Sequence, residues 1–330
     1  MRRILIGITI ALFWLTGCDD EVCRDMPAHN VTVEVDIERL DQKLFQSQSE
    51  AEVLTLLNSN PGFTELFLDG DQYPSNQIIA NKLFGLINDP YVDTLYHETQ
   101  SEYSDLGPIE AEFENTFANI KYFYPDFTAP AIKAAVTGLY KDLVITDSLI
   151  IVGLDHFLGA GATYKPLDVP DYILERYTDQ HMVSIIATFI GSTYNNVNLQ
   201  DKTMLAEMID YGKSYYFASR VMPCTPKHII IGYTAKEWED ANDNDEIIWA
   251  NLIENELLYE TNYVLKNKFI GERPNVFEIG ENCPGRIGRW VGWQIIEAYM
   301  ERNPDKSLTD LMANNNPLEI FQQSGYKPGR

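Results

Sequence analysis

A helical segment with three glycines places the strongest constraint on how this chain can fold. Residues 284–296 read Pro-Gly-Arg-Ile-Gly-Arg-Trp-Val-Gly-Trp-Gln-Ile-Ile, and the proline stands at the start, where a helix tolerates it. Each interior glycine costs a helix about 1 kcal/mol relative to alanine, so another contact must offset that cost. Gly285, Gly288 and Gly292 fall on one face, where a second backbone or a ligand can come close. The sequence therefore predicts either close helix packing or a binding groove along this face.

The first 18 residues predict a lipoprotein signal. Two arginines precede an apolar run at residues 4–14, and Leu-Thr-Gly-Cys follows. This order is typical of a secretory signal, and the small residue before Cys18 fits the peptidase that cleaves after a lipid has been attached to the thiol. We expect residues 1–17 to be removed, Cys18 to carry the lipid, and residues 18–30 to form a tether to the membrane. A plain signal peptide with a chance cysteine is the alternative.

The composition describes a strongly acidic, folded body. The chain has 25 basic and 49 acidic residues, with a formal net charge of −24, and removal of the leader with its two arginines makes it more negative. Such a body repels nucleic acid, so we expect envelope proteins as partners and no nucleic acid. No later segment reaches the ~18 apolar residues of a spanning helix. We predict a membrane-anchored protein of the cell envelope that faces the periplasm or the cell surface.

Periodicity predicts one α+β domain over residues 31–330, dominated by helices and containing a small sheet. Residues 31–37 alternate apolar and polar side chains as a half-buried strand does, and residues 143–154 read as a β-hairpin with its turn at Thr146-Asp147-Ser148. Further predicted elements are a helix at 39–57, a strand or short helix at 132–139, and helices at 181–194, 203–222 and 286–301.

No familiar catalytic motif is present. A zinc protease needs two histidines one helical turn apart beside a glutamate, and no two of the five histidines lie within five residues of each other. Gly-x-Ser-x-Gly and phosphate-binding glycine loops are absent as well. We therefore predict no catalytic residue, no metal ion and no cofactor.

The sequence does not decide which cysteines form a disulfide. Apart from Cys18 there are three, Cys23, Cys224 and Cys283, in a compartment that permits disulfides. A bridge between Cys224 and Cys283 would leave Cys23 free.

Four segments together resemble a known family. They are the lipobox ending at Cys18, Leu-Asp-His-Phe-Leu-Gly at 154–159 with Tyr-Lys-Pro at 164–166, the glycine-containing segment at 284–295, and Ser-Gly-Tyr-Lys-Pro at 324–328. Over nearly the whole chain they resemble the GldB family, the gliding-motility lipoproteins of Bacteroidetes. The resemblance implies an envelope lipoprotein that is needed for gliding and works alongside the secretion system that exports the motility adhesins. It implies no enzymatic activity.

A weaker resemblance connects the chain with predicted zinc peptidases of the gluzincin type. Residues 208–215 stand where the Glu-Gly helix of those proteins would be, with Tyr211 in place of the glutamate. The helix at 181–194, which would hold the histidine pair, has Ile-Ile-Ala-Thr-Phe in its interior. This likeness implies a degenerate, zincin-like fold without its metal, in which the cleft survives as a binding groove.

Three functions follow from these observations. The first is a non-catalytic, lipid-anchored component of the gliding and secretion apparatus. The second is a divergent envelope metallohydrolase built from Asp155, His156, Glu207 and Asp210. The third is a lipoprotein that binds peptidoglycan or another ligand on a tryptophan platform. The candidate groove residues are Asp155, His156, Gly212, Arg286, Gly288, Arg289, Trp290 and Trp293.

Overall fold

A four-stranded mixed sheet organises the N-terminal half of the protein. The structure is a computed structural model and describes residues 30–329; the predicted leader, Cys18 and the tether up to residue 29 lie outside these residues. The strands are β1 (Ile37–Arg39), β2 (Ala131–Ala135), β3 (Leu143–Ile145) and β4 (Leu149–Gly153), in the order β1-β2-β4-β3. The pairs β1–β2 and β2–β4 are parallel, and β3 runs antiparallel to β4.

Helices form the rest of the described chain. Before β2 they are α1 (Leu40–Phe45), α2 (Glu50–Ser59), the π-helix η2 (Phe63–Phe67), η3 (Gly70–Gln72), α3 (Asn76–Ile87), α4 (Pro90–Glu102) and α5 (Gly107–Phe123). After β4 they are η4 (Leu154–His156), α6 (Asp171–Leu174), α7 (Asp179–Tyr194), α8 (Met204–Val221), α9 (Lys227–Ile231), α10 (Ala235–Asp243), α11 (Asp245–Glu254), η5 (Leu257–Tyr259), α12 (Tyr263–Ile270), α13 (Ile287–Arg302), α14 (Leu308–Ala313) and α15 (Pro317–Ser324).

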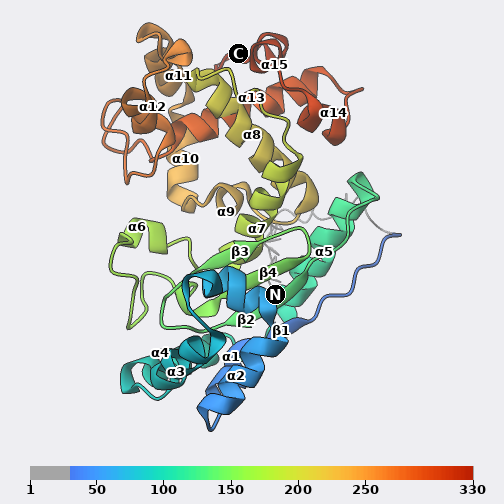
Figure 1. Ribbon diagram of the computed structural model, residues 1–330. Coiled ribbons are helices and arrows are strands. Elements are labelled where there is room, and N and C mark those ends of the chain that lie inside the picture. The colour runs from blue at the N-terminus through green and yellow to red at the C-terminus, as the bar shows by residue number, and fades with distance from the viewer. Residues whose placement is uncertain (1–29, 330) are drawn as a thin grey trace, which may run out of the picture.

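The sheet is buried on both faces. On β4, Ile150 and Val152 belong to the main core, and Ile151 between them belongs to a second, smaller core, because successive side chains of a strand point to opposite faces. On β2, Ala134 likewise belongs to the main core and Ala135 to the smaller one. Helices α1, α2 and α3 supply the small core, and α5 and α7 cover the other face (Figure 1). The predicted α+β architecture is confirmed.

The C-terminal helices gather at the far end of the molecule from α1–α4 (Figure 1). Helix α8 lies at their centre and packs against α13 along its length, with α7 and α15 beside it. Two tryptophans of α13, Trp290 and Trp293, are among the largest fully buried side chains. Within residues 30–329, no helix is both long and apolar enough to cross a bilayer.

The predicted hairpin is confirmed, whereas the strand predicted at 31–37 is wrong for all but its last residue. Leu143 pairs with Val152 across the hairpin, and the Thr146 N–H donates to the Leu149 carbonyl at its turn. Before β1, the backbone finds other partners, because the N–H of Val35 donates to Glu114 and the N–H of Ile37 to Glu110 of α5.

The helix predicted at 39–57 is in fact two helices. Ser49 interrupts it with extended backbone angles, and the Ser49 side chain accepts a hydrogen bond from the Glu52 N–H. A serine in this position satisfies one of the unpaired N–H groups of a helix start. Helix α1 therefore ends at Phe45, and Ser49 caps the start of α2.

Candidate functional site

The glycines of the segment at 284–296 are used for close packing of the backbone. A Cβ atom on Gly285 would lie 1.7 Å from the Arg273 carbonyl oxygen, and one on Gly292 would lie 1.8 Å from the Met208 carbonyl oxygen. Gly288 faces Phe269 at the end of α12, with 3.2 Å from its Cβ position to the carbonyl oxygen. The sequence left two alternatives for this face, close helix packing or a binding groove. The structure shows close packing, because α12 and α8 fill the face of Gly288 and Gly292.

The predicted groove is therefore corrected. Trp290 and Trp293 are 1% and 0% exposed, so they supply apolar area to the core and form no platform for a ligand. Gly212 is covered by Gly292, because a Cβ atom there would lie 2.4 Å from the Gly292 carbonyl oxygen. Arg289 donates to the Ile270 carbonyl at 2.7 Å, and its guanidinium lies over the Tyr211 ring.

Asp155 and His156 lie just after β4, in η4, and the buried Nε2 of His156 has no hydrogen-bond partner among the described residues. The Asp155 carboxylate is fully buried and accepts hydrogen bonds from the N–H groups of Thr137 (3.1 Å) and Leu139 (2.7 Å). Burial raises the pKa of Asp155 above its ordinary value, although these two N–H groups lower it. Since Leu139 has a positive φ of 62°, the carboxylate holds a strained turn after β2, which is a structural role.

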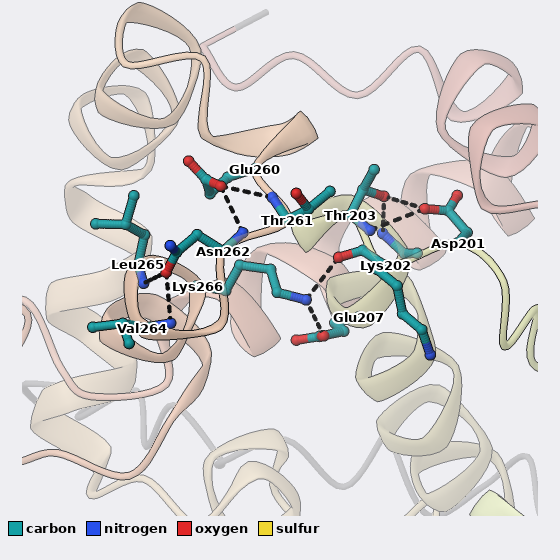
Figure 2. Close-up of polar contacts among 11 residues, drawn as sticks. Asp201, Lys202, Thr203, Glu207, Glu260, Thr261, Asn262, Val264, Leu265 and Lys266 are labelled. Carbon is teal, nitrogen blue, oxygen red and sulfur yellow. Dashed lines mark hydrogen bonds and ion pairs between the residues drawn. The ribbon is translucent and has the colours of Figure 1, made fainter.

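The carboxylates considered for a hydrolase also have structural partners. Figure 2 shows Glu207 of α8 beside Lys266 of α12. Lys266 is 4% exposed and donates to Glu207 and, at 2.7 Å, to the Lys202 carbonyl. Asp210 accepts from the Asn195 amide, and burial raises the pKa of its carboxyl. In the part of the chain that the structure describes, no three His, Cys, Asp or Glu side chains gather as a metal site.

The thiols do not form the bridge considered from the sequence. Cys283 is free and buried, so the Cys224–Cys283 pairing is wrong. Burial raises the pKa of the Cys283 thiol to about 12, which keeps it protonated and unreactive at neutral pH.

The structure instead brings together a cationic pocket that the sequence did not reveal. It is a cavity of about 140 Å³ at the starts of α7, α10 and α13. Of the predicted groove residues, only Arg286 lines it. The lining residues are Tyr172, Glu175, Arg176, His181, His228, Ile229, Gly232, Tyr233, Thr234, Ala235, Glu237, Arg273, Gly285 and Arg286. We call this cavity the arginine pocket.

Arg286 is the structural centre of the arginine pocket. Its backbone is left-handed, with φ 59°, a conformation that costs a non-glycine residue roughly 1–2 kcal/mol. The guanidinium compensates by donating to the carbonyls of Ile231 (2.7 Å) and Gly232 (2.8 Å) at the end of α9, and it stacks on the ring of Tyr233. The Tyr233 hydroxyl in turn donates to the Gly285 carbonyl at 2.7 Å.

One carboxylate beside the pocket forms ion pairs with three arginines. Glu272 lies 2.7 Å from Arg176, 3.5 Å from Arg286 and 3.6 Å from Arg289. Burial alone raises the pKa of Glu272, but the arginines outweigh burial and hold that pKa below its ordinary value. Three guanidiniums thus surround one carboxylate, and two further carboxylates, Glu175 and Glu237, line the pocket itself.

Two histidines add neutral donors and acceptors. His181 lies in the first turn of α7, is 9% exposed, and its Nδ1 is 2.9 Å from the Thr178 hydroxyl. Burial first, and then the nearby His228 and Arg176, lower the pKa of His181 to about 4. Burial also lowers the pKa of His228. At neutral pH the pocket therefore offers guanidinium and imidazole groups suited to holding an anion.

No local motif in the sequence pointed to this pocket. Arg176 follows α6, His181 begins α7, and Arg273 lies in the loop before α13. Arg176 and His181 lie about ninety residues before Arg273, and they meet it because α7, α9 and α13 all pack around α8. The one signal was the Pro-Gly-Arg sequence at 284–286, whose arginine lines the pocket.

One comparison with known proteins identifies a family. The model of the family described as gliding motility protein GldB matches residues 23–328, which is nearly the whole chain. No curated protein and no solved structure matches the chain, and the likeness to zinc peptidases stays a prediction. The chain belongs to the family of the gliding motility protein GldB.

Proposed function

We propose that this protein is a lipid-anchored component of the cell envelope that works in gliding motility and the protein secretion associated with it, without catalysing a reaction. The observation that carries the proposal is the family match over residues 23–328. The lipobox at residues 15–18 supports the anchor, and its lipid would be attached to Cys18. Its partners would be other envelope proteins of the motility machinery, on the periplasmic side or at the cell surface.

The contacts of the titratable residues support the absence of catalysis. Asp155 holds a backbone turn, Glu207 pairs with a buried lysine, and Asp210 is bonded to Asn195. Each of these three carboxylates is held by the fold through one of its oxygens.

The test of this function is genetic. The gene is deleted in the native bacterium, and single-cell gliding and the amount of adhesin at the cell surface are measured with and without a wild-type copy. We expect both to be lost on deletion and restored by the copy. Normal gliding and normal adhesin export in the deletion strain would refute the proposal.

The anchor is tested separately by chemistry. Cells grown with labelled palmitate should incorporate label into the wild-type protein and none into Cys18→Ala. After fractionation, the wild type should sediment with membranes. Equal labelling of the two proteins would show that Cys18 is not the lipid attachment site, without bearing on the motility role.

A further inference from the structure

We propose that the arginine pocket binds the C-terminal carboxylate of a peptide. This proposal does not depend on the lipid anchor or on the motility role. Its first support is a pair of unused donor atoms on one arginine. Arg176 contacts Glu272 through Nη2, whereas among residues 30–329 its Nε and Nη1 have no acceptor. Nε and Nη1 do not share an edge of the guanidinium, so a carboxylate would accept a charge-assisted hydrogen bond from one of them.

The balance of charge in the pocket favours an anion with a single charge. Arg286 is held by two carbonyls and Arg273 by Glu278 at 2.9 Å, which leaves Arg176 as the guanidinium with donors to spare. His181, with its pKa lowered by burial, is neutral at pH 7. Glu175 and Glu237 also line the cavity and would repel a dianion more strongly than a carboxylate. The cavity therefore suits a carboxylate better than a phosphate dianion.

The pocket suits the C-terminal end of a peptide in size and is too small for a whole peptide. A cavity of about 140 Å³ holds a carboxylate and a small side chain, and the stacked Arg286 and Tyr233 are part of its lining. His228 and Ile229 line this cavity and also a second one of about 610 Å³. The two cavities therefore adjoin at His228 and Ile229, and in this proposal the peptide runs from Arg176 toward the second cavity.

The second cavity contains an acceptor without a donor. Asn119 lines it and is 1% exposed. Its Nδ2 donates to the Val221 carbonyl at 2.9 Å, but its buried Oδ1 has no hydrogen-bond partner among the described residues. An unsatisfied buried acceptor is costly, and the backbone N–H of a bound peptide is a donor that would satisfy it.

The experiment is calorimetry on the full-length lipoprotein in detergent. The probes are acetyl-trialanine with a free C-terminus, the same peptide with a C-terminal amide, and inorganic phosphate. We expect the free acid to bind and the amide to bind at least about tenfold more weakly, because a charge-assisted hydrogen bond to the carboxylate is lost. Phosphate should not bind.

Two arginine variants locate the binding. Arg176→Gln should weaken binding of the free acid about tenfold or more, whereas Arg220→Gln, at the exposed end of α8, should leave it unchanged. Equal binding of acid and amide, binding of phosphate alone, or no binding of any probe would overturn the proposal. Because acid and amide are compared on the wild type, the test stands even if Arg176→Gln does not fold.

Discussion

Gly212 of α8 and Gly292 of α13 lie in direct backbone contact, so that a Cβ atom on Gly212 would fall 2.4 Å from the Gly292 carbonyl carbon and oxygen. Real Cβ atoms do not come this close to a backbone, and the two helices could accept a methyl group only by moving apart. Since both helices belong to the main core with Met208 and Trp293, their separation would loosen the C-terminal half as a whole. The glycines that weaken an isolated helix thus allow the backbones of α8 and α13 to touch.

Gly292→Ala should therefore destabilise the protein severely. Its methyl group would overlap the Met208 carbonyl oxygen, and we expect a loss of at least about 3 kcal/mol in the free energy of unfolding, measured with urea. The matched control is Gly85→Ala in the exposed middle of α3, where a Cβ atom meets nothing within 4 Å. The control should gain roughly 0.5–1 kcal/mol. Similar stabilities for the two variants would contradict the packing described for α8 and α13.

Lys213→Met should destabilise the junction between α8 and α14. Lys213 is 2% exposed, and its ammonium donates to the carbonyls of Met312 (3.1 Å) and Asn314 (2.8 Å). Methionine fills the space but leaves these carbonyls without a donor, at a cost of about 1–3 kcal/mol. Lys202→Met, whose side chain is exposed, is the control and should change the free energy of unfolding by less than about 0.5 kcal/mol. An unchanged stability of Lys213→Met would refute this role.

Asp155→Ala and Asp155→Asn should differ in stability. Both remove the charge, but asparagine keeps an oxygen that can accept from the N–H groups of Thr137 and Leu139. Because burial already raises the pKa of Asp155, the neutral amide is the better replacement. We expect the alanine variant to be about 1–3 kcal/mol less stable than the asparagine variant in urea. Equal stabilities would show that the turn does not depend on this side chain.

His181 should make the protein less stable in mild acid. In the unfolded chain the imidazole takes up a proton near its ordinary pKa of 6.5, whereas in the folded protein burial lowers that pKa to about 4. Between these values the unfolded chain binds more protons, so His181 reduces the stability as the pH falls from about 6.5 to 4. His181→Gln should show a smaller decrease in melting temperature over this range. Both proteins have the same carboxylates, so the comparison isolates the imidazole, and identical pH profiles would contradict the buried position of His181.

Local patterns predicted the elements whose partners are close in sequence. The hairpin of β3 and β4 needs only its own alternation and turn, and α7, α8 and α13 each carry a long apolar pattern. The strand expected at 31–37 failed because glutamates of α5, more than seventy residues later, take its N–H groups. The sequence cannot show such a partner.

The candidate site was also predictable only in part, because its residues come from segments that lie far apart in the sequence. Glycine spacing indicated that something approaches α13 closely, but it could not distinguish Gly212 from a ligand. Arg286 was identified because it stands beside those glycines. Arg176 and His181 were not identified, since neither is part of a motif. Both lie in a loop or at a helix start whose position depends on tertiary packing.

The most direct test of the central claim is rescue of the deletion strain with Cys18→Ala compared with the wild-type gene. The account predicts that the wild-type copy restores single-cell gliding and surface adhesin, and that Cys18→Ala, made in comparable amount, restores neither. Full rescue by Cys18→Ala would contradict the claim that the protein works as a lipid-anchored component of the motility machinery.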